Sequence, residues 1–242
     1  MFKRFLELLR KDDLLQQAFD RSWEMITVDR EMFVAATRSL REQDDARIKQ
    51  DIYAIDQKIN AYEREVRRKV FTHLAVDADR DLHAGLVLVS IVIDIERIGD
   101  YTKNIVELAL HHPNRLHCGP FEEDVRRIES TVRTMFDLLL EALPARDVDK
   151  AAEVMSEHWW IAKRSNGIVN DLLEKDAIGL ACREAVAVAL YIRFLKRISA
   201  HLMNIASSVV NPFDRIGFRR DTPEPGGAQG PASGPGASHR GR

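Results

Sequence analysis

Proline is scarce in the first 220 residues of this chain, and this scarcity constrains the fold more than any other feature. Only Pro113, Pro120, Pro144 and Pro212 interrupt long stretches rich in Ala, Leu, Glu, Arg and Ile. Proline removes a backbone donor and clashes with the preceding helical turn, so long proline-free stretches of good helix formers favour long helices. The sequence therefore predicts an all-α protein.

Apolar residues recur at helical spacing in six segments, which form two groups of three. We expect the polar segment Glu42–Asp45 to cap the start of the second helix, and Pro113, Pro144 and Pro212 to end the helices that precede them. The six predicted helices cover roughly residues 14–40, 46–74, 79–112, 121–143, 147–175 and 178–210.

The two groups of helices resemble each other in sequence. A shift of 100 residues sets residues 94–107 over 194–207, and the coinciding pairs are Arg97/Arg197, Ile98/Ile198, Asn104/Asn204 and Ile105/Ile205. These identities lie at the end of each group, as an internal repeat would place them. The pattern predicts two tandem three-helix bundles, and we expect the paired Arg and Asn side chains to bridge helices.

The last residues have a different composition. Residues 221–242 are rich in proline and glycine and carry few apolar side chains, which is typical of a disordered segment. We therefore expect a first bundle over residues 1–112, a second over 118–212, and a disordered tail over 221–242.

Composition restricts the classes of function. The formal net charge of the 242 residues is −2, so no overall field attracts the chain to nucleic acid, and we expect no nucleic-acid partner. No run of about 18 apolar residues predicts a membrane span. Cys118 and Cys182 lie far apart and match no zinc spacing, so we expect a reduced, cytoplasmic protein.

Two carboxylates stand out in the third predicted helix. Glu96 and Asp100 are a like-charged i, i+4 pair beside an apolar face, an arrangement that costs an isolated helix roughly 0.2–0.5 kcal/mol. Such a pair indicates a counter-charge, which is either Arg97 and Lys103 nearby or a bound cation.

The same helix carries a family signature. Residues 94–107, DIERIGDYTKNIVE, resemble the signature (D)LERIGDxxxNIAE of the PhoU family of phosphate-signalling proteins. The match combines charged, glycine and amide positions in one order, and the resemblance extends over roughly residues 14–212. It implies a fold of two three-helix bundles side by side, in agreement with the internal repeat.

The resemblance also implies a metal site. In PhoU-like proteins an E(D)xxxD motif of the third helix and acids of the second helix hold metal ions on the surface. Glu96 and Asp100 match the motif, and Asp56 in IYAIDQKIN matches the second-helix position. Carboxylates one helical turn apart suit hard or borderline cations, and the sequence does not distinguish Fe, Zn, Mg, Mn or Ni.

This chain departs from the family pattern at several positions. In the first repeat, Ile52 stands where the family often has another acid, and Asn60 is neutral. In the second repeat, Lys196 and Ala200 replace the two acids of the motif, and Ala162 stands opposite Asp56. We therefore expect at most one of the family's two clusters, in the first bundle.

By this resemblance, the protein is expected to be a negative regulator of phosphate transport and phosphate-starvation signalling. It would act through contacts with a phosphate transporter component and a sensor histidine kinase at the inner membrane, as a cytoplasmic homodimer. Two alternatives stay open. The protein could be an accessory protein of a sodium/phosphate-type transporter, which the degenerate second repeat favours, or a helical scaffold without a phosphate role.

No enzyme signature is present in the sequence. It contains no P-loop, no GxSxG, no HExxH and no Rossmann glycine fingerprint. A di-iron carboxylate bundle would need Glu-x-x-His on two helices, and no histidine of this chain has Glu three residues before it. We therefore expect a protein that binds rather than catalyses.

Overall fold

The computed structural model describes residues 14–44, 51–76, 78–112, 114–175 and 178–219. Within these ranges the chain forms six long α-helices and two short 3-10 helices, and no strand. The long helices are α2 (Leu14–Glu42), α3 (Ile52–Val76), α4 (Ala78–His111), α5 (Glu122–Ala145), α6 (Val148–Glu174) and α7 (Cys182–Val210), and the short ones are η1 (Gly119–Phe121) and η2 (Phe213–Arg215).

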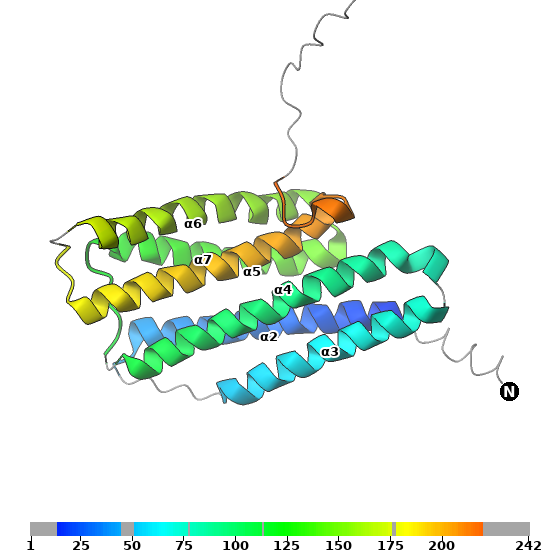
Figure 1. The fold of residues 1–242 in the computed structure, drawn as a ribbon, viewed down its shortest axis with the longest axis horizontal. Helices are drawn as coiled ribbons and strands as arrows, with labels where there is room; N and C mark the ends of the chain where they lie inside the picture. The colour runs from blue at the N-terminus through cyan, green and yellow to red at the C-terminus, as the bar shows by residue number, and fades with distance from the viewer. Residues whose placement is uncertain (1–13, 45–50, 77, 113, 176–177, 220–242) are drawn as a thin grey trace, which may run out of the picture.

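The long helices form two three-helix bundles that lie side by side (Figure 1). Helices α2, α3 and α4 make the first bundle, and α5, α6 and α7 make the second. The bundles meet where α4 packs on α7 and α2 packs on α5. The predicted all-α fold of two tandem bundles is confirmed. The tail predicted at 221–242 lies outside the described residues.

One apolar stripe packs helix α4 into the core. Ile91, Ile95, Ile98 and Val106 are all buried in the core shared with the neighbouring helices, as their helical spacing predicts. Burial of such side chains stabilises the fold by roughly 1.5–3 kcal/mol each. None of the helices in the described ranges has the length and apolar character needed to cross a membrane.

Polar side chains join the two bundles along the contact between α4 and α7. Asp94 Oδ1 accepts a hydrogen bond from Asn204 Nδ2 at 2.9 Å and lies 2.7 Å from His201 Nδ1. Arg197 Nε donates to the hydroxyl of Tyr101 at 3.2 Å. The expectation that the paired Arg and Asn side chains bridge helices is confirmed for Arg197 and Asn204, and the helices they bridge belong to different bundles. It is not confirmed for Arg97, whose ion pairs are with Glu96 and Asp100 of its own helix.

Pro144 does not end α5, contrary to the sequence prediction. The helix continues to Ala145, and the chain turns at Arg146, which has a left-handed φ of 52°. Proline cannot donate the helical hydrogen bond, here to the carbonyl of Leu140, and its ring also crowds that carbonyl. The indole Nε1 of Trp23 in α2 donates to that carbonyl at 3.1 Å, so the freed acceptor is used between bundles.

The start of α3 also differs from the prediction. The helix begins at Ile52 and not just after Glu42–Asp45. The carboxylate of Asp51 accepts a hydrogen bond from the backbone N–H of Ala54 at 3.1 Å, which satisfies one of the free donors of the first helical turn. Asp51 therefore performs the capping role that the sequence pattern assigned to the earlier acids.

Candidate functional site

The structure brings the three predicted metal ligands to one region between α3 and α4. Asp56 comes from α3, and Glu96 and Asp100 come from successive turns of α4. The ammonium of Lys103 joins the two helices, because its Nζ lies 3.0 Å from Asp56 Oδ1 and 3.3 Å from Asp100 Oδ1. A positive charge therefore lies between two of the three carboxylates.

Arg97 supplies the second positive charge at this site. Its Nη1 lies 3.0 Å from Asp100 Oδ2, and its Nε lies 3.6 Å from Glu96 Oε2. The pKa of Glu96 is raised above its ordinary value, chiefly by burial and next by the negative charge of Asp100. Arg97 thus compensates only part of the negative charge of Glu96 and Asp100.

A fourth carboxylate, which the sequence analysis missed, lies behind these three. Asp29 of α2 has an exposed fraction of 0%, and within the described ranges neither of its oxygens has a hydrogen-bond partner. Its pKa is raised well above the ordinary value by burial, and the charges of Glu96, Asp56 and Asp100 raise it further. We define these four residues, Asp29, Asp56, Glu96 and Asp100, as the acidic cluster.

Gly99 makes room for the buried acid. A Cβ atom at this position of α4 would lie 3.1 Å from Asp29 Oδ1 and 3.1 Å from Ile59 Cδ1, which is closer than most such contacts. The Asp29 carboxylate therefore faces the turn of α4 that carries both acids of the motif. The sequence did contain a signal for Asp29, because it interrupts the buried apolar stripe of α2 formed by Met25, Ile26, Met32 and Phe33.

As the side chains stand, Asp56, Glu96 and Asp100 form an ion-pair network with Arg97 and Lys103. Among the described residues, no three His, Cys, Asp or Glu side chains are grouped closely enough to hold a metal ion. The chemistry of the cluster nevertheless fits a cation: four carboxylates lie near two cationic side chains, and the buried one has no partner in the part of the chain that the structure describes. A metal ion that bound here would replace the ammonium of Lys103.

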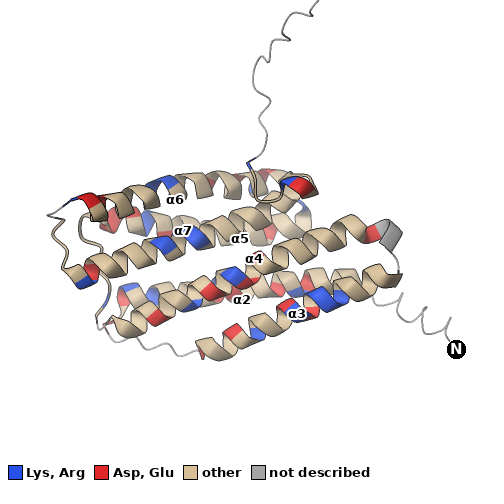
Figure 2. Ribbon diagram, in the orientation of Figure 1, with Lys and Arg blue, Asp and Glu red and all other residues tan. Residues whose placement is uncertain are grey.

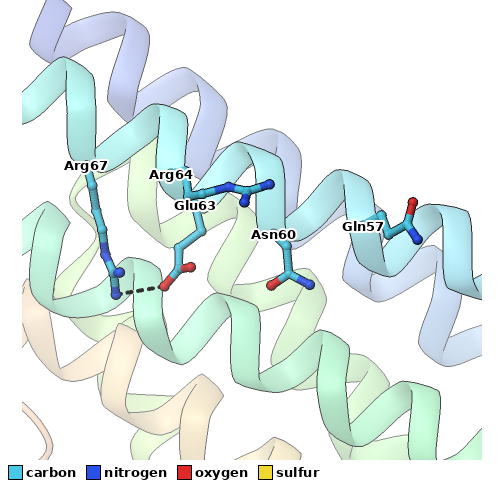
Figure 3. Close-up of a pocket in the computed structure, with 5 residues that line it drawn as sticks. All are labelled: Gln57, Asn60, Glu63, Arg64 and Arg67. Carbon is cyan, nitrogen blue, oxygen red and sulfur yellow. Dashed lines mark ion pairs between the residues drawn. The ribbon is translucent and has the colours of Figure 1, made fainter.

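An open polar depression of about 690 Å³ lies along α3 beside the acidic cluster. Its lining residues are Gln57, Asn60, Glu63, Arg64 and Arg67, and Figure 3 shows their side chains along α3. Arg67 Nη2 pairs with Glu63 Oε1 at 2.8 Å, and Asn60 Nδ2 lies 3.5 Å from Asp56 Oδ2. Asn60 thus connects the depression to the cluster.

The corresponding region of the second bundle has different chemistry. Lys196, which stands where Glu96 is in the first repeat, donates from Nζ to Asn166 Oδ1 at 2.7 Å. The Oγ atom of Ser199, the counterpart of Gly99, lies 3.0 Å from His158 Nδ1. Burial, together with the positive charges of Lys196 and Arg197, lowers the pKa of His158 to about 4. The local charge here is positive or neutral.

Comparison with known proteins identifies the relatives of this chain. The family described as "PhoU domain" matches residues 22–109 and 125–209. A "Phosphate-specific transport system accessory protein PhoU homolog" of Caulobacter vibrioides is 26% identical over 172 residues, covering 68% of this chain and 73% of the relative. The Pseudomonas aeruginosa protein of the same description is 26% identical over 171 residues, covering 69% and 70%.

Solved structures share the fold. The crystal structure of PhoU from Pseudomonas aeruginosa superposes with a TM-score of 0.70 at 24% identity, covering 81% of this chain and 95% of that one. The phosphate transport system regulatory protein PhoU from Streptococcus pneumoniae also gives 0.70, at 19% identity, covering 81% and 92%. The two matched segments together include most of the chain and all six long helices contribute to them, so this protein belongs to the PhoU domain family.

Proposed function

We propose that this protein is an accessory regulator of phosphate transport, which holds phosphate uptake and starvation signalling off when phosphate is ample. The observation that carries the proposal is the match of both halves of the chain to the PhoU domain. Relatives that cover about two thirds of the chain are described as accessory proteins of a phosphate-specific transport system.

The protein acts by contact rather than by catalysis. It binds a transporter component and a sensor histidine kinase at the cytoplasmic face of the inner membrane, and it does so as a homodimer. The outer faces of the helices supply suitable surfaces: both signs of charge alternate along α3 (Figure 2). On α4, the exposed side chains of Leu82, Leu86 and Ile93 lie on one stripe.

The metal part of the proposal assigns Asp56, Glu96 and Asp100 as ligands of an ion that shapes this surface. Their convergence between α3 and α4 supports the assignment, and so does the ammonium of Lys103, which lies where a cation is electrostatically favoured. When bound, the ion would fix the two helices relative to each other. Iron, zinc, magnesium, manganese and nickel are the candidates.

The test of the regulatory role is a phosphate-starvation reporter in cells that lack this protein and grow in ample phosphate. The proposal predicts that the reporter stays on, and that a plasmid copy of the gene turns it off. A reporter that stays off in both strains would contradict the proposal and favour a scaffold without a phosphate role. Repeating the experiment without each phosphate transporter would distinguish a phosphate-specific system from a sodium/phosphate carrier.

A further inference from the structure

The contact between α6 and α7 in the second bundle carries positive charge at the surface. Residues 158–170 of α6 and 185–210 of α7 include no Asp or Glu, and Figure 2 shows blue bands and no red in the middle of α7. Arg164 pairs with Asp124 of α5. The remaining Lys and Arg of these stretches form no ion pair within the described part of the chain, and we define them as the basic face: Lys163, Arg193, Lys196 and Arg197.

The first bundle shows how the same positions look when their charges are paired. Arg97, the repeat counterpart of Arg197, forms ion pairs with Glu96 and Asp100 of its own helix. In the second repeat, Lys196 replaces the first of these acids and an alanine replaces the second. The second repeat has therefore kept the arginine and lost both of its carboxylates, so the charge of the basic face is left for a group outside the described chain.

Neutral partners hold two of these cations in place. Lys196 Nζ donates to Asn166 Oδ1 at 2.7 Å, and Arg197 Nε donates to the hydroxyl of Tyr101 at 3.2 Å. Lys163 lies one helical turn before Asn166, on the same side of α6. Binding usually loses affinity because long side chains must become ordered. That loss is smaller here, which favours a target with carboxylates at matching positions.

Apolar side chains continue the basic face along α7. Val186 and Leu190 have exposed fractions of 55% and 40%, and they share one helical stripe with Arg193 and Arg197. The stripe is thus apolar over one part and basic over the next. An amphipathic helix with apolar and acidic residues at helical spacing complements such a stripe.

A lipid surface fits the basic face less well than a protein does. The net charge of −2 gives the chain no overall attraction to an anionic membrane. Anionic lipids are also mobile, so they gain little from cations that are held at fixed positions by Asn166 and Tyr101.

We propose that the basic face, together with Val186 and Leu190, docks an acidic, partly apolar helix of a protein partner. This inference rests on the proposed function, in which the chain acts by contact, and it gives that contact one surface and one partner chemistry. Carboxylates of the partner pair with Arg193, Lys196 and Arg197, as Glu96 and Asp100 pair with the counterpart arginine in the first bundle. Its apolar residues cover the two exposed aliphatic side chains.

The first test measures binding of fluorescent poly-L-glutamate to the full chain by anisotropy. Arg193→Gln/Lys196→Gln should weaken binding about tenfold, and salt should weaken the binding of the wild type. The matched control is Arg64→Gln/Arg68→Gln, which removes two exposed arginines of α3 that form no ion pair within the described ranges. This control should bind as the wild type does. All three proteins should melt at similar temperatures, since no ion pair is lost.

The second test uses the phosphate-starvation reporter in ample phosphate. Arg193→Glu/Lys196→Glu should leave the reporter on, as deletion of the gene does, and so should Leu190→Asp. The control Arg64→Glu/Arg68→Glu should keep it off. Mutations that restore repression to the charge-reversed variant should replace Asp or Glu by Lys or Arg in another protein, and their positions identify the docked helix.

The outcomes separate this inference from the proposal on which it rests. A charge-reversed variant that still represses, or equal poly-L-glutamate binding in the basic-face variant and its control, would overturn the docking role and leave the regulatory role standing. A reporter that stays off in the deletion strain would overturn the proposed function, while the binding measurement would still test the basic face.

Two further results would assign the basic face to a different occupant and so overturn the inference. The first is binding of the wild type to vesicles of phosphatidylglycerol and phosphatidylcholine that is lost in Arg193→Gln/Lys196→Gln. The second is a wild-type dimer that becomes a monomer in the same variant, measured by analytical ultracentrifugation. The inference predicts neither vesicle binding through this face nor a change of oligomeric state.

Discussion

The guanidinium of Arg41 in α2 lies against the carboxylate of Glu129 in α5, with 2.9 Å between Nε and Oε1. This ion pair joins the two bundles from within, because the side chains have exposed fractions of only 6% and 11%. Arg41 also pairs with Glu122 Oε1 at 2.6 Å and donates to the carbonyl of Leu116. One side chain therefore ties α2 to α5 and to the connection before it.

Removal of Arg41 should destabilise the protein strongly. In Arg41→Met the carboxylate of Glu129 stays buried without its cation, and breaking a buried pair in this way costs about 3–5 kcal/mol. Urea unfolding followed by circular dichroism measures the free energy of unfolding. The double variant Arg41→Met/Glu129→Met should recover much of the loss, since neither charge then remains. A double variant as unstable as the single one would show that the stranded charge is not the cause.

Lys103 should compete with a cation at the acidic cluster. In Lys103→Met, Asp56 and Asp100 lose the ammonium between them, so the protein in EDTA should be less stable, while its affinity for Mn²⁺ should rise by about tenfold. The control is Lys69→Met on α3, which removes a lysine of similar exposure that pairs with Glu65. Calorimetric titration of both variants with Mn²⁺ checks the prediction. An unchanged affinity of Lys103→Met for Mn²⁺ would contradict the idea that the ammonium of Lys103 occupies the position of the cation.

His158 should make the stability depend on pH. Burial and the positive charges of Lys196 and Arg197 depress the pKa of His158 to about 4, against about 6.5 in the unfolded chain. The folded state therefore disfavours the charged ring. Its contribution is fully present above about pH 6.5, and up to about 3 kcal/mol is lost as the pH falls to about 4.

The measurement is urea unfolding between pH 7.5 and 4.5 for the wild type and His158→Gln. The difference in unfolding free energy between the two should shrink as the pH falls, because the variant lacks the titrating ring. His111→Gln, which changes an exposed histidine, should follow the wild type at every pH. A difference that is constant over this range would mean that His158 does not titrate as its burial requires.

Much of the fold could be predicted from local sequence features. Proline spacing and apolar periodicity depend on neighbouring residues alone, and they located the six long helices and the buried face of α4. The prediction at Pro144 was wrong because the sequence does not show that α5 runs one residue past this proline, or that Trp23 donates to the Leu140 carbonyl that it leaves without a helical partner.

The site could be predicted only in part, for the same reason. Glu96 and Asp100 share one helix and a motif, so their proximity follows from spacing. The place of Asp29 could not be predicted without knowing which face of α2 lies against Gly99. The ion pairs of Arg41 could not be predicted without knowing that α2 packs on α5. Contacts between helices that are distant in sequence produce no periodic pattern of residues. At Asp29 the sequence did offer one signal, a single acid within an apolar stripe.

The most direct test of the account is the rate of phosphate uptake in ample phosphate, measured in cells that lack this protein and carry either an empty plasmid or the wild-type gene. A regulator that restrains a phosphate transporter predicts rapid uptake with the empty plasmid and restored restraint with the gene. Equal and low uptake in both strains, with the protein shown to be present in the second, would contradict the proposed function.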